Sequence, residues 1–140
     1  MKRILWVVLG AALVTAGCAD PIAPATPTPA VPTVVDTFSD TLLLLGANTH
    51  LFTVSTIGGV KVTLTRVEPG SAVGVGVGTP SNGSCSLIDH INAVAGQSVL
   101  LSGTATVPGS YCVAIYDITD GSGVGSLVEP VAYTINVLHS

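Results

Sequence analysis

Basic residues are scarce in this sequence of 140 residues, which has four lysines and arginines against eight aspartates and glutamates. Lys2 and Arg3 lie at the extreme N-terminus. A chain without that segment keeps Lys61 and Arg66 against the eight acids, a formal charge of −6. Because such a surface repels phosphate backbones, we expect no nucleic-acid partner.

The motifs of several enzyme classes are also missing. There is no G-x-S-x-G segment to present a nucleophilic serine and no H-E-x-x-H pair for zinc. The histidines, His50, His90 and His139, are far apart in the sequence. Since no nucleophile, base and orienting group can be named together, we expect a non-catalytic protein without cofactor or metal. The alternative is a small secreted hydrolase or metal-dependent enzyme whose site assembles only in space.

Calcium has one pair of candidate ligands, in the segment DITDGSG at 117–123. Asp117 and Asp120 could offer carboxylate oxygens to the ion. The EF-hand spacing, with acids at alternate positions and a late glutamate, is absent. A solvated turn formed by aspartate and glycine is the better interpretation.

The N-terminus reads as an export signal. Lys2 and Arg3 precede a short apolar run at 4–14, which is shorter than the roughly 20 residues of a membrane-spanning helix. Small residues then lead directly into Cys18. The segment TAGC at 15–18 resembles the lipobox of bacterial lipoproteins, which implies cleavage before Cys18 and lipidation of its thiol. A plain signal peptide with a chance cysteine is the alternative.

Proline, alanine and threonine dominate residues 20–33. Such a segment favours extended polyproline II and cannot bury a core. We therefore divide the chain into a signal-peptide helix at 1–17, a lipidated cysteine with a disordered tether at 18–35, and a domain at 36–140. These features predict a protein of the bacterial cell envelope, anchored to a membrane by lipid, on the periplasmic face or on the cell surface.

Cys85 and Cys112 remain once Cys18 is used. In an exported protein such a pair most often forms a disulfide. Metal ligation is the alternative, but no further ligand follows at a recognisable spacing.

Beyond the tether, apolar and polar residues alternate with period two, and no segment has a helical period. Val60, Val62 and Leu64 alternate with polar neighbours, as do Phe52 with Val54 and Tyr133 with Ile135 and Val137. Further strands are expected near 37–45, 72–78, 98–104 and 110–118. Turn signals separate them at 57–59, 68–70, 79–83, 107–109 and 120–123. The pattern predicts an all-β protein, a small Ig-like β-sandwich of about seven or eight strands.

Three smaller features add expectations. The segment AVGVGVG at 72–78 reads as a strand whose glycine face is closely covered or simply exposed. The segment DHIN at 89–92 reads as an exposed loop or strand end, and on a strand Asp89 and His90 would point to opposite faces.

If Tyr111, Val113 and Ile115 face inward, Cys112 faces outward. The disulfide would then join a loop to the outer face of a sheet, near the candidate binding aromatic Tyr116.

Two segments, PGSYCVAIYDI at 108–118 and EPVAYTINVLH at 129–139, resemble the closing strands of the bacterial pre-peptidase C-terminal (PPC) domain. The segment FTVSTIGGVKVTLT at 52–65 resembles that family's early hairpin. The resemblance implies a jelly-roll-like sandwich and an accessory role in binding. The sequence ends just after the expected last strand, so we expect no catalytic domain in the same chain. We therefore expect a module that binds or scaffolds another envelope component, a protein or a polysaccharide.

Overall fold

The computed structural model describes residues 26, 28–96, 100–119 and 125–140 of the chain. These residues form eight strands, and none of them is helical. In chain order the strands are β1 (Val34–Leu42), β2 (Ala47–Val54), β3 (Gly58–Glu68), β4 (Val73–Ser81), β5 (Ser84–Ala93), β6 (Leu101–Ala105), β7 (Gly109–Tyr116) and β8 (Val131–His139). The described residues contain no helix long and apolar enough to cross a membrane.

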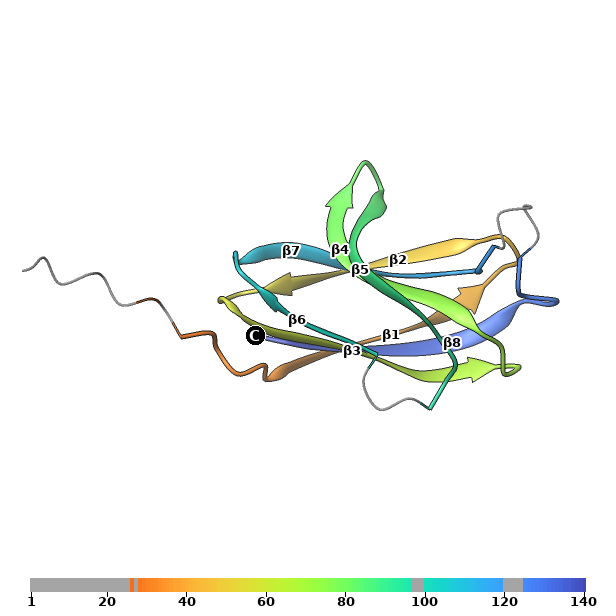
Figure 1. The fold of residues 1–140 in the computed structure, drawn as a ribbon, viewed down its shortest axis with the longest axis horizontal. Coiled ribbons are helices and arrows are strands. Elements are labelled where there is room, and N and C mark those ends of the chain that lie inside the picture. The colour runs from red at the N-terminus through yellow and green to blue at the C-terminus, as the bar shows by residue number, and fades with distance from the viewer. Residues whose placement is uncertain (1–25, 27, 97–99, 120–124) are drawn as a thin grey trace, which may run out of the picture.

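The strands form two four-stranded antiparallel sheets, ordered β1-β8-β3-β6 and β2-β7-β4-β5 (Figure 1). The pairings are nested, since β1 pairs with β8, β2 with β7, β3 with β6 and β4 with β5. This is the order that results when one long hairpin is rolled into two facing sheets, which is the jelly roll. The predicted all-β sandwich of seven or eight strands is confirmed.

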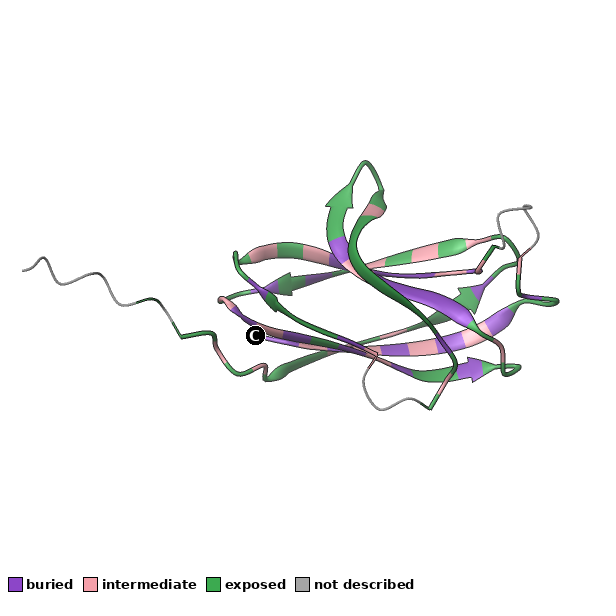
Figure 2. Ribbon diagram, viewed as in Figure 1, coloured by how far each residue is buried: buried purple, intermediate pink, exposed green. Residues whose placement is uncertain are grey.

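Alternation along the strands places the core between the sheets. In β3, Val60, Val62 and Leu64 are buried, and a register shift between Leu64 and Arg66 returns Val67 to the core. The inward residues of β8, including Tyr133, are almost completely buried. Figure 2 shows the same banding, with buried and less buried residues alternating along β8. The period-two prediction for these strands is confirmed.

Strand β5 was not anticipated. Residues 89–92 lie within it, so DHIN is neither a loop nor only a strand end. Nine of its ten residues are at least partly exposed, and Figure 2 shows it exposed along most of its length. Since neither face of β5 is well buried, its sequence carries no period-two signal.

The chain enters the sandwich earlier than residue 36. Strand β1 begins at Val34, and Ala30 forms an isolated parallel bridge with Gly58. The amide of Ala30 donates to the Ile57 carbonyl at 2.7 Å, and the Thr33 amide donates to the His139 carbonyl at 2.9 Å. The last residues of the expected tether are therefore bound to the same end of the sandwich as the C-terminus (Figure 1). The signal segment, Cys18 and the expected turn at 120–123 lie outside the described residues.

Candidate functional site

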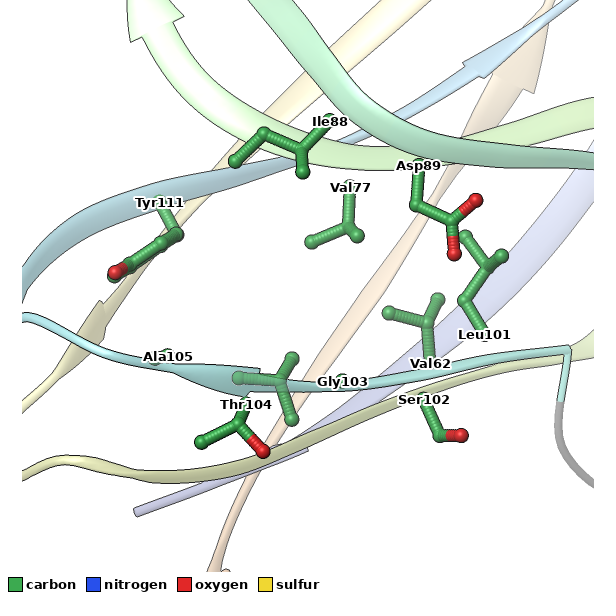
Figure 3. A pocket seen from close by; sticks show the side chains of 11 residues that line it. Val62, Val77, Ile88, Asp89, Leu101, Ser102, Gly103, Thr104, Ala105 and Tyr111 are labelled. Atoms are coloured by element: carbon green, nitrogen blue, oxygen red, sulfur yellow. The ribbon is translucent and has the colours of Figure 1, made fainter. Parts of the chain in front are cut away.

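An apolar cleft of about 270 Å³ opens between the two sheets, where the edge strands β5 and β6 lie opposite each other. Its floor comes from the core side of β3 and β4, through Val60, Val62 and Val77. Strand β6 forms one wall, and Ile88 and Asp89 of β5 form the other (Figure 3). Tyr111 of β7 closes one end.

Among the described lining residues, one charged group lies in the cleft wall. Figure 3 shows the Asp89 carboxylate pointing into the space above Leu101, while the side chains of Ser102 and Thr104 point away from it. The Tyr111 hydroxyl donates to the Val107 carbonyl at 2.8 Å, so its hydrogen is already used. The cleft therefore presents an apolar surface with one anionic group.

The hollow exists because position 103 has no side chain. Gly103 pairs with Val60 of β3, so a side chain there would share the inward face of the sheet. A Cβ at this position would meet no atom within 4 Å. A residue with a side chain would fill the space that the sandwich leaves open here.

A β-bulge aims the β5 residues into the cleft. The pairing of β4 with β5 shifts between Val77 and Gly78, which face Asp89 and Leu87, so Ile88 is the extra residue. A bulge turns neighbouring side chains away from strict alternation. Ile88 and Asp89 therefore both line the cleft although they are adjacent in sequence, and Ile88 remains 72% exposed.

The β4–β5 hairpin is fixed by the disulfide between Cys85 and Cys112, whose Cα atoms are 5.8 Å apart. The predicted pairing is confirmed, but Cys85 lies on strand β5 and not in a loop. Cys112 is fully buried, yet it is not part of the hydrophobic core cluster. It lies on the outer face of its sheet, as expected, and is buried because the hairpin covers it.

The glycine face of β4 is closely covered. A Cβ on Gly74 would lie 2.1 Å from a ring carbon of Tyr116, and one on Gly78 would come within 1.9 Å of the Ser86 carbonyl oxygen. Tyr116 is therefore half-buried against β4, which favours packing over binding as its role. The glycines let β5 fold back far enough for Cys85 to reach β7.

A polar network lies on the opposite side of the sandwich. His50 of β2 stacks on Phe38 of β1 with ring centres 4.8 Å apart, and its Nε2 lies 2.7 Å from the Tyr133 hydroxyl. The Asn48 side-chain amide donates to the same hydroxyl at 3.0 Å. Burial lowers the pKa of His50, and the nearby Asp40 carboxylate offsets part of that effect. The ring therefore favours the neutral form, and in the tautomer with an unprotonated Nε2 it accepts a hydrogen bond from the Tyr133 hydroxyl.

Asp117 joins two loops through hydrogen bonds from backbone amides, and we call this set of contacts the Asp117 latch. Its Oδ2 accepts the Leu45 amide at 2.9 Å, and its Oδ1 accepts the amides of Ser126 and Leu127 and the Ser126 hydroxyl. Burial would raise the pKa of Asp117, but these hydrogen bonds outweigh it and lower the pKa. Amide donors already surround both oxygens, so the described contacts are structural. Asp117 is buried and not solvated, so the turn interpretation does not describe it. Asp120 lies outside the described residues, so calcium binding by the pair, the less favoured interpretation, is not tested.

The remaining histidines lie apart. His139 is buried, with Nε2 at 3.0 Å from an Asp36 oxygen, and His90 is exposed on β5. Within the described ranges, no group of three or more His, Cys, Asp or Glu side chains could hold a metal ion.

Comparison with protein-family models and with curated proteins finds no match to this chain. The interpretation of the cleft therefore depends on its own geometry.

Sequence reasoning did not show that these residues enclose a cleft. Asp89 was visible only as part of an exposed segment, and Gly103 lay inside an expected strand without special meaning. An apolar pair flanking an aspartate, as in Ile88 and Ile91 around Asp89, is the one signal that could have pointed to an unprotected edge.

Proposed function

We propose that this protein is a non-catalytic lipoprotein of the bacterial cell envelope whose jelly roll binds or scaffolds another envelope component, a protein or a polysaccharide. The observation that carries the proposal is the apolar cleft between β5 and β6, with Asp89 in its wall. Exposed apolar surface next to a preformed hollow is typical of an interaction site. The jelly-roll strand order is also what the resemblance to PPC domains implies, and it supports a relationship to them.

The binding proposal is tested by photo-crosslinking in the native host. A photoreactive amino acid replaces Ile88 at the cleft mouth, and in a matched control it replaces Thr53, an exposed residue of β2 at the other edge of the same sheet. We expect a discrete cross-linked species from position 88 and none from position 53. The same labelling from both positions, or from neither, would contradict a partner in the cleft.

The anchoring proposal is tested by mass spectrometry of the protein isolated from host membranes. We expect a mature chain that begins at a lipidated Cys18, with no free thiol at Cys85 or Cys112. A Cys18→Ser variant should keep residues 1–17 and lose the lipid. An unmodified Cys18 still preceded by the leader in the wild-type protein would contradict this proposal.

A further inference from the structure

We propose that the component bound at this site is an extended polypeptide segment, which adds to β5 as a further strand, buries an apolar side chain in the cleft and places a basic side chain at Asp89. This inference rests on the proposed function and names the class of partner.

Strand β5 has an open edge. It is the last strand of its sheet, and among the described residues it pairs only with β4. The His90 amide donates to the Asp89 carboxylate of the preceding residue at 2.9 Å. The His90 amide is therefore bonded within β5 itself, and it could instead donate to a carbonyl group of an incoming strand.

Edge strands are usually protected by short length, lysine, proline or a covering loop. Strand β6, the opposite wall, has only five residues. Strand β5 has ten residues, contains neither lysine nor proline, and exposes Ile88 and Ile91. Its bulge and the inward-pointing Asp89 give partial protection, but residues 89–93 pair regularly with β4 beyond the bulge. This regular part is the docking edge that we infer.

Strand addition also explains the position of the cleft. In an added strand every second side chain would point toward the interior of the sandwich, because side chains alternate. On β5 the inward positions are Asp89, Ile91 and Ala93, opposite Val77, Val75 and Val73. An inward apolar residue of the partner would therefore enter the cleft beside Asp89.

The negative charge of Asp89 favours partner segments that carry a basic side chain. Of the described residues that line the cleft, Asp89 is the one acidic group, and the chain after residue 17 carries a formal charge of −6. A basic side chain would gain a charge-assisted hydrogen bond, while an acidic one would be repelled. A glycan fits less well, since the Asp89 carboxylate is the one inward polar group among the described lining residues that could orient its hydroxyls.

The inference is tested with fluorescently labelled nine-residue peptides and purified full-length protein, by fluorescence anisotropy. One peptide alternates threonine and valine around a central lysine that shares a face with its valines, and a matched peptide has glutamate there. We expect the lysine peptide to bind about tenfold more tightly, the size of one charge-assisted hydrogen bond. Asp89→Asn should remove that preference, and Glu129→Gln, an exposed acid outside the strands, should keep it. Equal binding of the two peptides would overturn the assignment of Asp89.

Strand addition is tested with two variants of the lysine peptide that carry methyl groups on alternate backbone amides. In one variant the methyl groups block one edge of the extended peptide, and in the other variant they block the opposite edge. One set of methyl groups should abolish binding and the other should be tolerated, and equal effects of both sets would overturn the strand geometry. Gly103→Val, which fills the cleft, should weaken binding of the unmethylated peptide. If no peptide binds while position 88 still cross-links to a glycan, this inference fails and the proposed function stands. If position 88 gives no specific cross-link either, both fail.

Discussion

Asp117 shows how much one side chain can contribute when its partners are backbone groups. Only 5% of it is exposed, and it joins the β1–β2 turn at Leu45 to the segment before β8 at Ser126 and Leu127. Leu45 is 72 residues from Asp117 in sequence, and Leu127 is 10 residues from it. Turn rules consider only neighbouring residues, so they could not reveal that Asp117 joins these two segments. The sequence showed only an aspartate beside glycines.

Replacing Asp117 with asparagine should lower the free energy of unfolding by about 2 kcal/mol, because an amide group would turn a donor toward backbone donors. The native pKa lies below the ordinary value of 3.8. The stability due to this carboxylate is therefore full above that pH and is lost as pH falls through the lowered pKa. Urea unfolding at pH 7 and pH 3 measures both effects. An Asp117→Asn protein as stable as the wild type at pH 7 would refute the latch.

His50 should make stability depend on pH in the mildly acidic range. Its native pKa is below 6.5, chiefly because of burial, so the fold favours the neutral ring. The associated stability is full above pH 6.5 and is lost as pH falls through the lowered pKa. We expect the melting temperature to fall between pH 7.5 and pH 5.5, and less so in His50→Gln. His90→Gln, at an exposed site, is the control and should keep the wild-type slope.

Among the elements, β4 and β5 show where sequence patterns succeed and where they fail. Strands β3 and β8 could be predicted because each buries one face, and alternation records that directly. In β4 the alternating valines predicted the inner face. The sequence did not show whether the glycine face was covered, because that depends on the path of β5. The bulge, the exposed edge and the cleft depend on which strands end each sheet, and no local pattern encodes that order.

Gly78→Ala tests the close crossing of β5 over β4. A Cβ there would lie 1.9 Å from the Ser86 carbonyl oxygen, which belongs to the backbone and cannot rotate away. We expect a loss of about 2 kcal/mol, typical of overpacking. Gly103→Val is the matched control, because its Cβ meets nothing within 4 Å. It should leave stability unchanged or raise it by about 1 kcal/mol, since glycine within a strand is unfavourable. Equal losses in thermal unfolding would contradict this contrast.

Over the whole molecule, the disulfide is the covalent link between the β4–β5 hairpin and the central strand β7. It spans 27 residues of sequence. The domain is small enough for a constraint on its unfolded chain to form a large part of its total stability.

The double variant Cys85→Ser, Cys112→Ala should therefore lose about 3.5 kcal/mol of unfolding free energy, the value expected for closing a loop of this length. Chemical denaturation of the oxidised wild type and the variant gives the difference. A reduced wild-type sample is the control and should behave like the variant. Identical midpoints for all three would show that hairpin packing alone fixes β5.

Under the proposed anchoring, the bridge between Ala30 and Gly58 would limit how far the domain can lie from a membrane. With Cys18 lipidated as proposed, twelve residues would separate the lipid from the first contact with the sandwich at Ala30, six fewer than the predicted boundary implies. At the polyproline II rise of about 3.1 Å per residue that the sequence predicts, twelve residues would reach about 37 Å. A partner bound at the β5 edge would then stay within a few nanometres of the bilayer. The protein could not reach partners that lie farther from the membrane than that.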